Sequence, residues 1–133
     1  MNFELYLRKR YPERNIVSFR ETGYISVQEG LDIQKKTDGT VNILGEVATA
    51  QAGSYMIQMG MSASLFTIFT HHATSTEYLL LTLRNYLMEY GGFSDENLAM
   101  AQVLSVLKFD IHIMKDVSGK RYIQRITEII QLQ

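Results

Sequence analysis

Apolar residues along this chain fall into two kinds of pattern, short continuous runs and stripes at helical spacing. Three short runs, at residues 15–20, 41–47 and 63–70, have the length and β-branched content of buried strands. The last of them carries apolar residues on both of its faces, because successive side chains of a strand point to opposite sides. The pattern therefore predicts a strand covered by helices on both sides, as in a parallel sheet.

Helix signals occupy the segments between these runs. A first helix should end just before Pro12, since proline disfavours helical conformation in the residue that precedes it. Ser26 and Glu29 form a capping-box pair, which predicts a short helix from about residue 27 to residue 36.

Two further helices follow the second and third runs. Thr49 is placed to cap one helix and Gly60 to close it. Thr74 and Glu77 form another capping-box pair, opening a longer helix that Gly91 stops. The apolar residues of this longer helix recur at helical spacing: Leu79, Leu83, Leu87 and Tyr90.

The C-terminal third begins with one more helix and then changes to period two. Ser94 is placed to cap the helix, which should run to about Leu107. The dipeptide Ser118-Gly119 then marks a turn, and residues 121–130 complete a terminal β-hairpin. The order of elements predicts an α/β fold, with a mainly parallel sheet flanked by helices and a C-terminal β-hairpin.

Composition narrows the class of protein. The chain has 133 residues, of which 46% are hydrophobic and 20% charged, so we expect a single globular domain over residues 1–133. A net charge of -1 gives no direct signal for nucleic-acid binding. The absence of cysteine excludes disulfides and thiolate metal sites. No apolar run approaches the length of roughly 18 residues that a membrane span needs, so any membrane association should be peripheral.

Candidate chemistry lies where two of the predicted strands end. Glu46 closes one strand at the edge where open α/β sheets place their ligands, and a carboxylate there can hold a magnesium-bound water or align an attacking water. His71 and His72 follow the next strand and should point to opposite faces, so one of them could hydrogen-bond a γ-phosphate. The alternative is a solvated acid and two surface histidines.

Three segments, in this order, resemble the ATPases of type II and type IV secretion, conjugative transfer and pilus assembly, a RecA-like P-loop NTPase family. Residues 41–47 (VNILGEV) are similar to the Walker B strand of the family. Residues 64–73 (SLFTIFTHHA) are similar to its Ser-Leu-x-Thr stretch and His box. Residues 110–128 are similar to its closing hairpin. The resemblance covers roughly residues 15–130.

The resemblance implies a partial RecA-like fold and a site that takes ATP and Mg²⁺. Counting from Glu46 favours His71 as the family histidine, whereas the alanine that follows the His box favours His72. Glu21 follows a strand where the family carries an acidic box, and only this acid is kept. The implied site consists of catalytic carboxylates, Glu46 and Glu21, and nucleotide-binding residues, Gly45, Thr70, His71 and His72.

The chain departs from the family in lacking a Walker A motif, G-x-x-x-x-G-K-[ST]. Its one Gly-Lys pair, Gly119-Lys120, is followed by Arg121 and lies in the predicted hairpin turn, where no helix N-terminus can face a phosphate. Ala48 also stands where the family often has an arginine. We therefore expect the chain to be the C-terminal part of such an ATPase domain, as a truncated product or a fragment, and to hydrolyse ATP poorly on its own.

Two functional hypotheses follow from the resemblance. The first is the Walker B and His-box part of a cytoplasmic motor ATPase, whose relatives form hexamers at the inner face of the bacterial membrane. Its partners would be copies of itself, an upstream half that supplies the phosphate loop, and other secretion-system components. The second is a non-catalytic interaction module in a secretion or conjugation assembly, since a sheet without its phosphate-loop strand has an unpaired edge that can recruit another chain.

Overall fold

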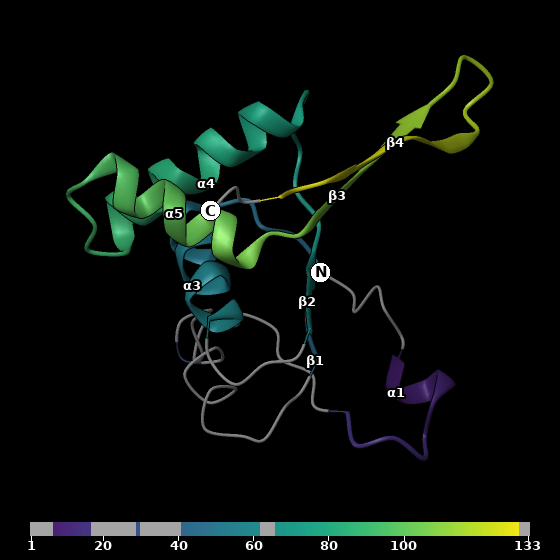
Figure 1. Cartoon of the computed structure of the whole chain (residues 1–133). Coiled ribbons are helices and arrows are strands. Elements are labelled where there is room, and N and C mark those ends of the chain that lie inside the picture. Colours follow the sequence, from purple (N-terminus) through teal and green to yellow (C-terminus); the bar gives the residue numbers. More distant parts are fainter. Residues whose placement is uncertain (1–6, 17–28, 30–40, 62–65, 131–133) are drawn as a thin grey trace. The chain divides into compact units, whose positions relative to one another are not determined.

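The computed structural model describes residues 7–16, 29, 41–61 and 66–130, and the chain divides into two compact units (Figure 1). The first unit, Met1–His71, contains α1 (Leu7–Arg10), β1 (Val41–Leu44), α3 (Ala50–Gly60) and β2 (Phe66–Phe69). The second unit, His72–Gln133, contains α4 (Thr76–Tyr90), α5 (Glu96–Val106), β3 (Phe109–Lys115) and β4 (Arg121–Glu128).

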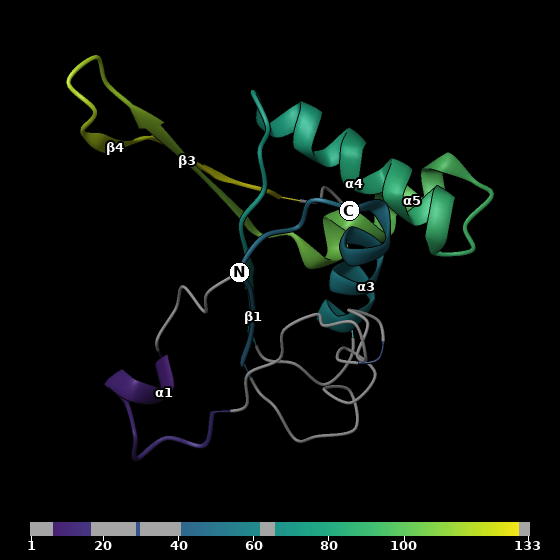
Figure 2. The ribbon, with the colours of Figure 1, turned by 180° about the vertical axis from the view of Figure 1, so that it is seen from behind.

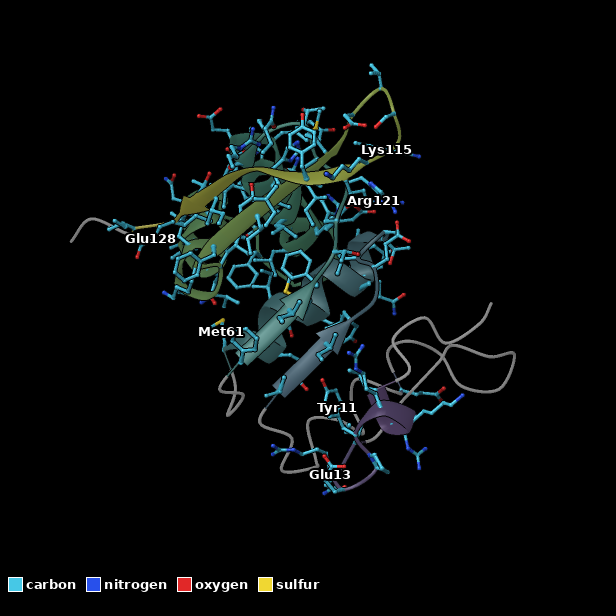
Figure 3. The ribbon with its side chains drawn as sticks, turned by 90° about the vertical axis from the view of Figure 1, so that its right-hand side faces the viewer. Tyr11, Glu13, Met61, Lys115, Arg121 and Glu128 are labelled. Carbon is cyan, nitrogen blue, oxygen red and sulfur yellow. The ribbon has the colours of Figure 1, made fainter. Side chains whose placement is uncertain are left out.

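The first unit is built on a parallel strand pair. β1 and β2 are hydrogen-bonded in the register Val41 to Phe66 through Leu44 to Phe69, and the two arrows lie side by side in Figure 3. α3 connects them and packs against β2. The predicted cap is confirmed, because the Thr49 hydroxyl oxygen accepts a hydrogen bond from the Ala52 amide at 3.1 Å. A strand–helix–strand crossover of this kind is what a parallel pair requires.

The predicted N-terminal helix is confirmed where the structure describes it, whereas Asn15 and Ile16, at the start of the predicted strand, are not in a strand. α1 ends at Arg10, and the Tyr11 amide donates to the Leu7 carbonyl at 2.8 Å just before Pro12. Glu29 is helical, in agreement with the predicted helix around it. The rest of that helix, most of the strand predicted at residues 15–20, and Glu21 lie outside the described residues.

The parallel pair is covered differently from the prediction. Asn42 on β1 is buried, but four apolar side chains of the pair are more than a third exposed: Val41, Ile43, Phe66 and Ile68. The register places these four on one face, since Val41 is opposite Phe66 and Ile43 is opposite Ile68. Within the described residues α3 covers only the other face, so the expected two-sided cover is not present there.

The helices of the second unit pack against each other (Figure 2). Leu79, Leu83 and Leu87 of α4 are buried, as their spacing predicts. Tyr90 is exposed, so its assignment to this stripe was wrong. Three residues in α5 and just after it complete this core: Ala99, Val103 and Leu107.

Both helix caps in this unit lie one residue later than predicted. The Ser75 hydroxyl, not that of Thr74, accepts the Tyr78 amide at 3.1 Å. Asp95, not Ser94, caps α5 by accepting from the amides of Asn97 and Leu98. In each place two neighbouring residues are good cap formers, and the one that directly precedes the helix, with extended backbone, is the cap.

Gly91 ends α4, as predicted. Its amide donates to the Leu87 carbonyl at 2.7 Å, and a Cβ at this position would lie 2.6 Å from that same oxygen. A larger residue would therefore displace the last turn of the helix. Gly92, the next residue, has a φ of 78°, which glycine adopts without strain.

The C-terminal hairpin is confirmed. β3 and β4 pair antiparallel from Phe109 opposite Glu128 to Lys115 opposite Arg121, and Figure 3 shows Lys115 near Arg121 with Glu128 at the far end. Gly119 has a φ of 89° in the connecting turn. The Asp116 carboxylate organises this turn, accepting from the Ser118 hydroxyl and from the amides of Ser118 and Lys120.

The hairpin turns its polar face toward α4. The Thr76 hydroxyl donates to Asp110 at 2.6 Å and lies 3.5 Å from the hydroxyl of Thr127. The opposite face is apolar and more than half exposed: Phe109, Ile111, Ile113, Ile123 and Ile126. Alternation along the strands fixes these two faces, but polar contacts with α4 decide which one is covered.

Taken together, the described residues form a mixed α/β structure with a parallel pair and an antiparallel pair of strands. The coarse fold class is therefore confirmed. Because each described sheet has two strands, the mainly parallel RecA-like sheet stays a prediction. None of the helices in the described part of the chain has the length and apolar character that crossing a bilayer needs.

Replacing Leu83 with alanine should destabilise the protein by about 2–5 kcal/mol, because Leu83 is fully buried and its truncation leaves a cavity. Leu81→Ala is the matched control, since Leu81 lies on the same helix but is 42% exposed, and it should change the free energy of unfolding by less than about 1 kcal/mol. Urea unfolding followed by circular dichroism measures both values. Equal losses in the two variants would contradict the assignment of the core.

The hydrogen bond from the Ser118 hydroxyl, with those from the Lys120 and Ser118 amides, lowers the pKa of Asp116. A lowered folded-state pKa means that the carboxylate stabilises the turn above its ordinary pKa, and that this contribution is lost as pH falls through the lowered value. NMR titration of the Asp116 carboxyl should show a higher midpoint in Ser118→Ala than in the parent. Ser105→Ala on α5 should leave the midpoint unchanged, and an unchanged midpoint in Ser118→Ala would refute the role of the hydroxyl.

Candidate functional site

The predicted site residues gather where the parallel strands end. We call the segments 45–47, after β1, and 70–71, after β2, the strand-end junction. Since parallel strands end at the same edge of a sheet, the chain leaves β1 and β2 side by side. This is the edge at which open α/β sheets bind their ligands.

Three hydrogen bonds join the two segments of the junction. The Val47 amide donates to the Thr70 carbonyl at 2.8 Å, and the Thr70 hydroxyl donates to the Gly45 carbonyl. The third bond is 2.6 Å long and links Nδ1 of His71 to the Val47 carbonyl oxygen. The pairing of the strands therefore continues beyond the last residue of each strand.

The third bond determines which nitrogen of the His71 ring carries a proton. A carbonyl oxygen only accepts, so Nδ1 of His71 must carry a proton and donate. In the neutral ring Nε2 then has the lone pair. A backbone anchor on one nitrogen fixes the tautomer and orientation of the imidazole, which is how proteins prepare a histidine to act through its other nitrogen.

The two adjacent histidines differ in their surroundings. His71 is partly buried and bonded to the segment that contains Glu46, whereas His72 is exposed. Sequence counting left the choice between them open. The junction favours His71, because its ring is held by the residue next to Glu46.

Glu46 lies in the exposed part of the junction. β1 ends at Leu44, so Glu46 stands two residues beyond the strand and not at its last position, and the predicted strand at 41–47 was three residues too long. Val47 is only 1% exposed and anchors the segment in the core, while Gly45, at the bend after β1, and Glu46 are exposed. A buried anchor beside an exposed carboxylate holds the backbone of that carboxylate in place.

The structure thus brings four of the predicted site residues into adjacent segments: Gly45, Glu46, Thr70 and His71. His72 follows directly in the chain, and Glu21 lies outside the described residues. Sequence reasoning missed Val47, whose amide and carbonyl make two of the three junction bonds. No sequence signal could reveal it, because only its backbone takes part.

Of the groups that a magnesium–nucleotide complex needs, the junction offers one exposed carboxylate, that of Glu46. An exposed carboxylate is the kind of oxygen ligand that Mg²⁺ uses, usually one or two together with phosphate oxygens. A phosphate cradle needs backbone N–H groups and a lysine, and the Val47 amide is already bonded to Thr70. In the described residues no group of three acidic or histidine side chains could hold a metal ion by itself. The phosphate side of such a complex would need other groups.

Comparisons with known proteins leave the family open. A scan against protein-family models finds no match. A search of curated proteins and a search of solved structures find no significant match either. The resemblance to secretion ATPases therefore rests on the three quoted segments alone.

Proposed function

We propose that the strand-end junction is the water- and metal-side half of a nucleotide site, in a chain that forms the Walker B and His-box part of a secretion or conjugation motor ATPase. The observation that carries the proposal is the set of hydrogen bonds between residues 45–47 and 70–71, which places the Glu46 and His71 segments side by side at one sheet edge. Glu46 closes a segment similar to a Walker B strand, and His71 belongs to a segment similar to a His box.

The proposed roles follow from the chemistry of the groups. Glu46 would accept a proton or a hydrogen bond from a magnesium-bound or attacking water, which a solvent-exposed carboxylate can reach. His71, anchored through Nδ1, would use the lone pair of Nε2 to accept a hydrogen bond from a water molecule next to the phosphate. ATP with Mg²⁺ would supply the reacting phosphoryl group and its bound cation.

This half-site needs a phosphate loop from elsewhere. The 133 residues contain no Walker A motif, and that motif normally neutralises most of the charge that develops on the transferred phosphoryl group. An upstream half or a neighbouring subunit would provide it. The chain by itself should therefore bind Mg²⁺ and ATP weakly and not turn over.

A second candidate function, a non-catalytic interaction module, is supported by a separate observation. Val41, Ile43, Phe66 and Ile68 form an exposed apolar face on the parallel pair. Exposed apolar patches of this kind favour association with another protein surface. In this alternative the strand-end junction has a structural role only, and adding nucleotide does not change its structure.

Titration of the full chain with millimolar Mg²⁺ and ATP, followed by ¹H–¹⁵N NMR, separates the two functions. We expect the amide signals of Gly45, Glu46, Thr70 and His71 to shift together, because the ligand would touch both segments of the junction. Glu46→Gln should reduce these shifts severalfold. Glu128→Gln, which changes an exposed acid at the far end of the hairpin, should leave them as in the parent.

Shifts confined to other parts of the chain, or equal shifts in Glu46→Gln and the parent, would overturn the nucleotide proposal and favour the interaction module. ATP hydrolysis by the purified chain, measured as released phosphate, should be at the level of the buffer. Turnover that Glu46→Gln abolishes would show that the chain does not need an external phosphate loop.

A further inference from the structure

The free edge of β3 is a second feature of interest, and it does not depend on the nucleotide proposal. Within the part of the chain that the structure describes, β3 pairs only with β4. A two-stranded hairpin is marginal by itself, and three or more strands are usually needed for a stable sheet. Among the described strands, β3 therefore has one edge without a partner strand.

Hydrogen bonds at both ends of the hairpin show which β3 residues face outward. The Lys108 carbonyl accepts from the Ile129 amide at 2.8 Å, and the Asp116 amide donates to the Lys120 carbonyl at 2.9 Å. The backbone groups of even-numbered residues therefore point to β4. Because alternate residues of a strand bond to opposite sides, odd-numbered residues from Phe109 to Lys115 direct their N–H and C=O groups to the open edge.

The open edge of β3 is better suited than that of β4 to pair with another strand. Every residue from Phe109 to Lys115 has a partner, so β3 is regular over its length, whereas β4 has a bulge at Gln124 between the partners of His112 and Ile113. Bulges and charged side chains are the usual devices that keep an edge strand from pairing, and β4 also carries Arg121 and Arg125. β3 has no such protection between Asp110 and Lys115.

We propose that two copies of this chain associate through β3, antiparallel about a two-fold axis at His112, to form a four-stranded sheet in the order β4–β3–β3–β4. In this register Ile111 of one copy is opposite Ile113 of the other, and their outward backbone groups form hydrogen-bonded pairs. The two His112 residues meet at the axis as a non-hydrogen-bonded pair, which suits their inward-pointing backbone groups.

The side chains fit this register. Phe109 of each copy is opposite Lys115 of the other, and Asp110 is opposite Met114, so no two side chains of the same fixed charge are opposed. Phe109, Ile111 and Ile113 are 59%, 53% and 59% exposed, and all point to the outer face. Pairing joins them into one apolar band across the four strands. The partner that fits this edge is therefore β3 of a second copy, because two identical strands oppose compatible side chains in this antiparallel register.

Cysteine cross-linking tests the register, because the chain has no cysteine of its own. Non-hydrogen-bonded antiparallel partners have Cα atoms about 4.5 Å apart, within the range of a disulfide. His112→Cys should therefore give a disulfide-linked dimer under mild oxidation. Met114→Cys is the matched control on the same face, and its two copies would be separated by roughly 13 Å, at about 3.3 Å per residue, so it should stay monomeric.

Sedimentation equilibrium tests the association without a cross-link. The parent should have twice the mass of one chain, and Ile111→Lys/Ile113→Lys, which opposes lysines across the axis, should raise the dissociation constant at least tenfold. Leu98→Lys on α5 replaces another exposed apolar side chain and should leave the dimer intact. Unchanged helical circular dichroism shows that each variant folds. A monomeric parent, or cross-linking as efficient in Met114→Cys as in His112→Cys, would overturn the proposal.

Discussion

The parallel pairing of β1 with β2, extended by the bonds of the strand-end junction, is the constraint on which the candidate site depends. The Val47 amide is held by Thr70, and the Val47 side chain is buried. Leaving a buried amide unsatisfied costs about 1–3 kcal/mol, so the two segments are held together by more than their connection to the strands. Glu46 is exposed, and its backbone is held from one side by the buried Val47.

Local patterns in the sequence were sufficient to find the elements. Leucines at intervals of four gave α4, Ser118-Gly119 gave the hairpin turn, and Thr49 gave the start of α3. They were not sufficient to place the ends. Ser75 and Asp95 replace their neighbours Thr74 and Ser94 as caps, because each pair offers two suitable oxygens and the path of the incoming chain decides between them.

The sequence also could not predict which face of a strand is covered. Period two in the hairpin correctly separates an apolar from a polar face, but the polar face is the one that contacts α4, through Thr76 and Asp110. The apolar run in β2 likewise suggested cover on both sides, and in the described residues Phe66 and Ile68 are exposed. Both outcomes depend on partners distant in sequence. They also leave apolar side chains exposed on each unit.

For the candidate site, the residue types and their order along the chain stay a prediction from the sequence, which leaves the choice between the two histidines open. That choice depends on a bond to the backbone of Val47, which has no signature in side-chain chemistry. The same bond gives the central claim its most direct test. A long-range ¹H–¹⁵N NMR spectrum of the histidine rings at neutral pH reports which nitrogen of His71 carries the proton. The account predicts a proton on Nδ1. A ring protonated only on Nε2 would show that His71 does not donate to the Val47 carbonyl, and would contradict the account.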